Sequence, residues 1–493
     1  MTIPFDNSFV TLSDRFYSRQ APTPVANPQI IKLNDALVEQ LGLDAGYLHS
    51  SQGIAVLAGN HLPDGANPIA MAYAGHQFGH WVPQLGDGRA VLLGEVVDKD
   101  GQRFDLQLKG AGPTPYSRNG DGRAAIGPVI REYIVSEAMA ALGVPTTRAL
   151  SAVTTGEAVY RESALPGAVL TRVASSHIRV GTFQYFAARK DNDAIQQLTN
   201  YVIQRHYPDC AQAQSPALAL LEAVIQQQAN LVAQWQSIGF IHGVMNTDNA
   251  SVAGITIDYG PCAFMDTYNP ETVFSSIDHA ARYAYQNQPG IAQWNMANFA
   301  QCLLPLINDD EQKALSAAQQ AIDDFPAHYE KVYLHIFRKK LGLANEQEND
   351  AALVTDLLNA MAAQQADFTN TFRALCNICP GNANTEQNNA SFFDQFANDT
   401  AARDWLADWQ HRLVNESAQP ADSVALMKAS NPAYIPRNHK VEAALAAAQQ
   451  HDYNPTHELV EVLSAPYLLQ EKYADYTTPP SSDERVLATF CGT

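Results

Sequence analysis

The chain has few cysteines, fewer basic than acidic residues and no long apolar run. Six cysteines in 493 residues are too few for a disulfide-built scaffold, and a chain of this length can bury a core without one. Lys plus Arg total 31 against 51 Asp plus Glu, and the net charge of −20 argues against nucleic-acid and basic membrane-surface binders. No stretch reaches the roughly 18–20 apolar residues of a membrane span, and no signal peptide is recognisable. We therefore expect a soluble cytoplasmic globular protein.

The hydrophobic pattern predicts an α+β chain in three parts. Residues 1–84 form a loop-rich N-terminal extension with one amphipathic stretch, Ile30 to Leu43. Residues 85–178 form a β-rich lobe of limited size. Residues 179–493 form a larger, mostly helical lobe with an extended C-terminal tail.

Several elements follow from local patterns. Apolar residues 91–97, the turn Asp98–Gly101 and alternating residues 104–108 predict a β-hairpin. A helix is expected from Gly127 to Leu142, because its apolar residues recur at helical spacing. Short strands are expected at 147–154, 157–162, 167–173 and 255–257, and a long helix from Pro216 to Gly239.

The order of chemical groups in the β-rich part is typical of a nucleotide site. Gly86-Asp87-Gly88-Arg89 precedes the hairpin, Lys109 ends it, and Glu132 lies on the following helix. Protein kinases have this order, in which a glycine-rich loop and a Lys–Glu pair hold phosphates. A Gly-Asp-Gly alone would indicate only a turn.

A second group lies in the helical part, in the segment from His242 to Asn249, followed by Asp258-Tyr259-Gly260. Asn249 and Asp258 offer the oxygen ligands that Mg²⁺ prefers. Sugar-kinase loops place a catalytic Asp two residues after the His, but here that position is Val244. Asp248 is the nearby carboxylate that could replace it, so the fold can be kinase-like while the chemistry differs.

The histidines of His76-Gln77-Phe78-Gly79-His80 have the spacing of a zinc-binding helix. Gly79 and the following Pro83 argue against a helix there, so we expect no zinc site.

Over nearly its whole length the sequence resembles the selenoprotein O family of protein adenylyltransferases, also called pseudokinases. The resemblance rests on long strings rather than on one motif. They are 73–79, 84–90, 108–112, 116–123, 172–179, 242–249, 258–260 and 431–438.

The resemblance implies a protein-kinase-like bilobal fold and transfer of AMP from ATP to Ser, Thr or Tyr of proteins, the enzyme itself included. The nucleotide would bind in a flipped orientation relative to kinases. Asp248 matches the proton acceptor, Glu132 the partner of the Lys, and Asn249 with Asp258 the ligands of Mg²⁺ or Mn²⁺. The positions matching the ATP-binding residues are Gly86, Gly88, Arg89, Lys109, Asp121, Gly122, Arg172, Arg179 and Asp258.

Two alternatives stay open: uridylylation with UTP and Mn²⁺ at the same site, and a catalytically silent nucleotide-binding scaffold. The complete metal and proton-acceptor set argues against the scaffold. Cys491 occupies the family's selenocysteine-like position, a possible redox site. The residue three before it is Ala488 rather than the expected Cys, so a redox partner would have to come from elsewhere, such as Cys262.

Overall fold

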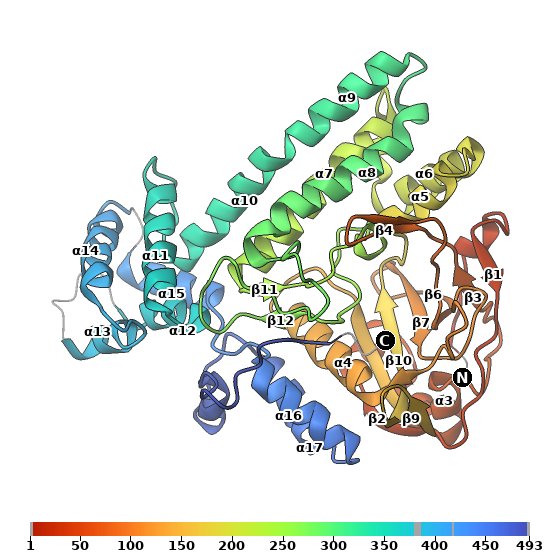
Figure 1. The fold of residues 1–493 in the computed structure, drawn as a ribbon, viewed down its shortest axis with the longest axis horizontal. Coiled ribbons are helices and arrows are strands. Elements are labelled where there is room, and N and C mark those ends of the chain that lie inside the picture. The colour runs from red at the N-terminus through yellow and green to blue at the C-terminus, as the bar shows by residue number, and fades with distance from the viewer. Residues whose placement is uncertain (1–2, 379–385, 417–418, 491–493) are drawn as a thin grey trace.

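The computed structural model describes residues 3–378, 386–416 and 419–490. An eight-stranded antiparallel sheet lies at one end and helices fill the rest (Figure 1). The expected combination of antiparallel strands and helices is confirmed. The sheet has the order β1-β3-β6-β7-β10-β9-β2, with β8 paired to β10. Its strands are β1 (Tyr17–Arg19), β2 (Gln29–Leu33), β3 (Ile69–Met71), β6 (Ala90–Val97), β7 (Arg103–Lys109), β8 (Ala124–Ala125), β9 (Arg148–Tyr160) and β10 (Ala164–Ala174).

The centre of the sheet is the predicted hairpin, β6 with β7. Alternation along β7 sends Leu106 and Leu108 to one face, where they are buried with the helices α1 (Asp35–Gln40), α2 (Ala45–His49) and α3 (Ser51–Leu57). Lys109 therefore points to the opposite face. The neighbouring β10 has the same alternation, with Val173 in the first core and Arg172 on the face of Lys109.

That second face is covered by α4 (Ile126–Ala141), the predicted helix, with α16 (Asn438–Gln449) and α17 (Asn454–Leu463) behind it (Figure 1). Ile126, Ile130 and Ile134 repeat at intervals of four and are all fully buried. The C-terminal helices thus support the helix that presents Glu132 to the sheet.

Three local predictions need correction. The strands expected at 147–154 and 157–162 are one strand, β9, which continues through Gly156 at φ 71°. The stretch from Ile30 to Leu43 is not one amphipathic element: β2 ends at Leu33, and Asn34 then caps α1 by accepting a hydrogen bond from the Leu37 amide. The strand expected at 255–257 is a single bridge between Thr256 and Thr146.

A second hairpin, β4 (Gly75–Gln77) with β5 (His80–Val82), spans the two histidines with zinc-like spacing. The prediction that this segment is not helical is confirmed.

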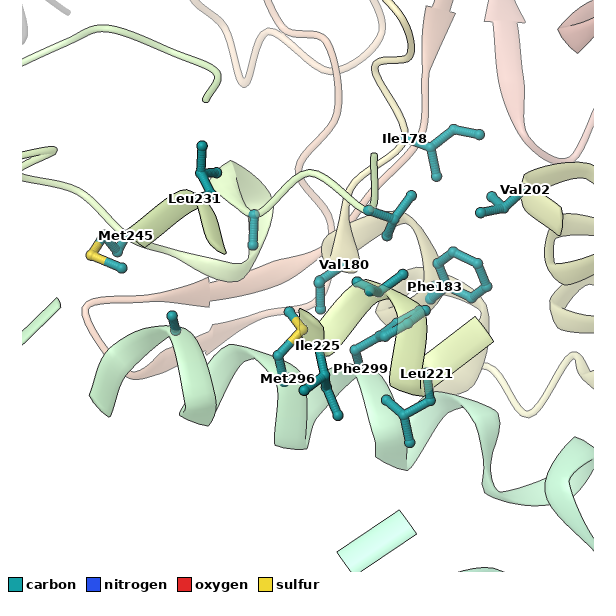
Figure 2. Packing of buried hydrophobic residues seen from close by; sticks show 14 of the residues in the cluster. Ile178, Val180, Phe183, Val202, Leu221, Ile225, Leu231, Met245, Met296 and Phe299 are labelled. Atoms are coloured by element: carbon teal, nitrogen blue, oxygen red, sulfur yellow. The ribbon is translucent and has the colours of Figure 1, made fainter. Parts of the chain in front are cut away.

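The helical part has two cores. The first joins the predicted long helix α7 (Pro216–Ser237) to α5 (Val180–Ala187), α6 (Asn192–His206) and α8 (Gln288–Ile307) (Figure 2). The helices α9 (Glu311–Asp323) and α10 (Phe325–Lys340) follow each other end to end and pack along α8 and α7 (Figure 1). The second core lies at the far end of α10 and includes the helices α11 (Asp350–Gln364), α12 (Phe368–Leu375), α13 (Glu386–Phe393), α14 (Thr400–Val414) and α15 (Pro420–Ser430). Within the described ranges, every helix is too short or too polar to cross a membrane.

Lys340, at the end of α10, is buried in this second core. Its ammonium lies 4.4 Å from the ring centre of Phe372 and 5.7 Å from that of Phe368, and among the described residues no carboxylate pairs with it. Burial lowers the pKa of Lys340 to about 7, opposed only by the Cys376 thiol. The pKa of Lys340 is lower in the folded than in the unfolded chain, so its charge costs folding free energy. This cost has its full size below pH 7 and decreases as the pH rises toward 10.5.

We expect Lys340→Met to raise the unfolding free energy at pH 7 by on the order of 4 kcal/mol, with the gain shrinking at pH 9. Urea unfolding at the two pH values measures it. Lys339→Met, at an exposed position of the same helix, is the matched control and should change little. A Lys340→Met gain that is the same at both pH values would contradict the assignment.

Candidate active site

A cavity of about 740 Å³ lies between the second face of the sheet, α4 and the loop that follows α7. Its wall contains all twelve predicted site residues that the structure describes: Gly86, Gly88, Arg89, Lys109, Asp121, Gly122, Glu132, Arg172, Arg179, Asp248, Asn249 and Asp258. The fold thus brings together residues up to 172 positions apart in the sequence (86 to 258).

The predicted Lys–Glu pair forms between the end of β7 and α4. The ammonium of Lys109 lies 2.5 Å from Glu132 Oε2. The guanidinium of Arg172 donates to the other oxygen of Glu132, with Nε at 2.7 Å. Both Arg172 and Glu132 are buried, and the cations Arg172 and Lys109 hold the pKa of Glu132 below its usual value although burial opposes this. Glu132 is therefore an ionised carboxylate that aims two cations into the cavity.

Asp258 is the point at which the cations converge. Its Oδ1 accepts from Arg172 Nη2 at 2.6 Å and from Lys109 Nζ at 3.1 Å, and its Oδ2 lies 3.3 Å from Arg179 Nη2. These charges hold its pKa well below the usual range against the effect of burial. Its backbone has φ 64°, in the left-handed region that is uncommon for non-glycine residues.

The direction of the Arg179 side chain is set by the residues on either side of it in the chain. Ile178 and Val180 are anchored in the first helical core, as Figure 2 shows, and the backbone between them is extended (φ −122°, ψ 164° at Arg179). Because successive side chains of extended chain point in opposite directions, the Arg179 side chain leaves the core. It enters the cavity wall, where it lies 4.5 Å from the ring centre of the buried Tyr73.

The glycine loop Gly86–Gly88 is fixed by a second loop. Gly86 has φ 122°, and a Cβ there would lie 2.4 Å from the ring of Tyr116. The hydroxyl of Thr114 donates to Asp87 O at 2.6 Å. The Asp87 side chain is buried and accepts from the Met71 amide and Gln107, which holds the loop in place, and Asp87, Gly88 and Arg89 all line the cavity.

Asp121 and Gly122 form the rim. Both oxygens of Asp121 accept from the guanidinium of Arg161, at 2.8 and 3.0 Å, and this pairing lowers the pKa of the carboxyl. The backbone at Gly122 has φ 64°, and a Cβ would lie 2.1 Å from Gly112 C. Only glycine allows this approach of the two loops.

The loop from His242 to Asn249 supplies the last groups. Asp248 is buried, which raises the pKa of its carboxyl to about 6. Its Oδ2 accepts from Gln77 Nε2 at 3.1 Å, and its buried Oδ1 has no hydrogen-bond partner among the described residues. Asn249 donates its amide nitrogen to Val244 O at 3.0 Å, which leaves its side-chain oxygen available as a ligand.

The donor set at this end of the cavity fits a divalent cation. The side-chain oxygen of Asn249 and the Asp258 carboxylate are hard oxygen donors, as Mg²⁺ and Mn²⁺ require. In the described part of the chain, no group of three or more His, Cys, Asp or Glu side chains forms a complete metal site. The remaining ligands would therefore have to come from substrate and water.

Cys491 lies outside the described residues. Cys262, the alternative partner considered for it, is buried four positions after Asp258.

Tyr73, Gln77 and Tyr116 are among the residues of the cavity wall that the sequence-based prediction of the site did not include. Tyr73 and Gln77 belong to the string 73–79, which contributed to the family resemblance but to which no site role was assigned. Their contacts with Arg179 and Asp248 span more than 100 positions, and one sequence has no local pattern that reveals such contacts.

Comparison with known proteins gives consistent results. A family model described as protein adenylyltransferase SelO matches residues 1–464. The protein nucleotidyltransferase YdiU of Bradyrhizobium sp. (strain ORS 278) is 58% identical over 491 residues, covering 99% of each chain. The proteins of that name from Bradyrhizobium diazoefficiens and from Rhodopseudomonas palustris (strain BisB5) are also 58% identical, with the same coverage.

Proposed function

The chain belongs to the protein adenylyltransferase SelO family, and from that membership we propose that it transfers AMP from ATP to hydroxyl side chains of proteins and releases pyrophosphate. It is an enzyme of the nucleotidyltransferase class. Its substrates are proteins, and Ser, Thr and Tyr, its own included, are the acceptors that we propose.

The observation that supports this reaction best is the cluster of cations around Asp258. A kinase site needs the Lys–Glu pair, but here two further buried guanidinium groups, Arg172 and Arg179, join Lys109. Arg binds phosphate oxygens in pairs through its planar fork. These cations suit a triphosphate whose β- and γ-phosphates leave together, because they neutralise the charge that develops on pyrophosphate.

In this reaction the carboxylate of Asp248, which lines the cavity, accepts the proton of the substrate hydroxyl. The hydroxyl oxygen forms a bond to the α-phosphorus, the bond from that phosphorus to the bridging oxygen breaks, and pyrophosphate departs with the electron pair. Val244 occupies the position of the usual kinase base and has no proton-accepting side chain, which agrees with a different acceptor.

Asn249 and Asp258 are the residues that would hold Mg²⁺ or Mn²⁺. When bound, the ion would supply positive charge beside the phosphate oxygens. Lys109, Arg172 and Arg179 would then turn from Asp258 toward phosphate, their alternative anionic partner.

We also propose that the architecture is a protein-kinase-like bilobal fold, with an N-terminal extension (1–84), a nucleotide-binding lobe (85–178) and a helical lobe (179–493). The order of glycine loop, strand Lys, helix Glu, loop and metal-binding Asp supports this. Strands β1, β2 and β3 make the extension continuous with the sheet of the nucleotide-binding lobe.

Intact-mass analysis tests the proposed function. After incubation of the purified protein with ATP and Mg²⁺ or Mn²⁺, we expect species heavier by whole AMP units. The same incubation with UTP tests the alternative, because UMP adds a different mass. Absence of a nucleotide-sized adduct on the protein and on an added protein mixture with every nucleotide and metal would favour the silent scaffold.

A further inference from the structure

His76 and Gln77 of β4, with Phe78 directly after the strand, bind three successive residues, 246–248, of the loop from His242 to Asn249, here called the catalytic loop. The His76 amide donates to Thr247 Oγ1 at 2.7 Å, and the Phe78 amide donates to Asn246 Oδ1 at 2.9 Å. Between them, Gln77 Nε2 donates to Asp248 Oδ2 at 3.1 Å. Residues 76–78 thus contact residues 246–248 through three hydrogen bonds, although 168 to 171 positions separate the bonded residues.

The strand approaches the catalytic loop so closely that only glycine fits at position 75. A Cβ on Gly75 would lie 2.9 Å from Asp248 Oδ1 and 3.0 Å from Thr247 Oγ1. On the other side, a Cβ on Gly181 would lie 2.2 Å from Ala74 O and 3.3 Å from Asp248 Cα. Asp248 therefore lies between Gly75 and Gly181. The orientation of its carboxylate is set by the hydrogen bond from Gln77.

The two oxygens of Asp248 differ in their surroundings. Gln77 holds Oδ2, while Oδ1 is buried without a hydrogen-bond partner in the described structure. A carboxylate with one oxygen fixed by an amide cannot rotate freely, and its remaining lone pairs stay available for a substrate proton. Gln77 also borders the cavity, so the contact lies at the site itself.

We propose that Gln77 is a positioning residue for the transfer reaction: its amide donates to Asp248 Oδ2 and so fixes the orientation of the proton-accepting carboxylate at the cavity wall. This inference rests on the proposed function of Asp248. In this proposal the segment 75–78 holds residues 246–248 of the catalytic loop in position through its hydrogen bonds.

The test compares Gln77→Met, which keeps the side-chain length but removes the donor, with the wild type. We expect kcat for AMP transfer to fall roughly 10-fold to 100-fold, the effect of losing a hydrogen bond to a charged group. The KM for ATP and the melting temperature should stay close to wild type, because the cation cluster is untouched. His80→Ala, at the exposed position paired with Gln77 in the hairpin, is the matched control and should keep full activity.

A second comparison shows whether Gln77 acts through Asp248. Single-turnover labelling should give the same rate for Gln77→Met/Asp248→Ala as for Asp248→Ala alone, which itself should be roughly 10²–10⁴ below wild type. Unchanged kcat in Gln77→Met, or a rise in KM for ATP that accounts for the whole loss, would overturn the inference. Multiplied losses in the double variant would also overturn it. Full activity of Asp248→Ala would instead refute the proton-acceptor assignment in the proposed function.

Discussion

Asp258→Ala should abolish transfer, with a loss of roughly 10³-fold or more. Three cations, Lys109, Arg172 and Arg179, converge on this carboxylate, and it is one of the two groups that would hold the divalent ion. Without it, the ion loses its charged protein ligand. The cluster would also retain three cations, of which Arg172 and Arg179 are buried, against Glu132 alone, which weakens their common orientation.

Two further variants distinguish the loss of a metal-binding group from unfolding of the protein. Asp258→Asn keeps the shape and should be nearly as inactive, because the charge is gone. Asn249→Ala should be milder, since water can replace a neutral ligand. Labelling assays with a melting curve for each variant measure these effects. Wild-type transfer by a folded Asp258→Ala would refute the assignment of Asp258 as metal ligand.

The sequence predicted those elements in which local pattern and tertiary structure agree. An apolar run before the turn Asp98–Gly101 and alternation after it predicted the hairpin of β6 and β7, and Pro216 marked the start of α7. The errors arose where the pairing of strands in the fold differed from what the local sequence suggested. Gly156 looked like the end of a strand, but β10 continues to pair with β9 beyond it. Thr256 has one bridge rather than a strand partner.

The site residues likewise fall into those that the order of elements predicts and those that only the fold or the family resemblance reveals. Lys109 and Glu132 follow from the order of elements, because a strand end and the next helix are neighbours in space. Arg172 could be named only from the family resemblance, since a buried Arg in a strand gives no local signal. Its role as second partner of Glu132 became visible only with the fold, as did the bond from Gln77 to Asp248.

Which phosphate moves is the central question for this enzyme. A kinase transfers the γ-phosphoryl group and releases ADP, whereas the proposed reaction attacks the α-phosphorus and releases pyrophosphate. The extra guanidinium groups of Arg172 and Arg179 favour the second course, because they suit a departing pyrophosphate. Val244 in place of the usual base also disfavours ordinary γ-transfer.

The most direct test uses ATP labelled at one phosphate at a time, with the purified enzyme, divalent metal and a protein acceptor. Label at the α-phosphate should appear on protein, and label at the γ-phosphate should appear in pyrophosphate and not on protein. Arg172→Ala and Arg179→Ala should lower the α-label transfer strongly. Protein labelled from γ-labelled ATP and not from α-labelled ATP would contradict the account and identify a kinase.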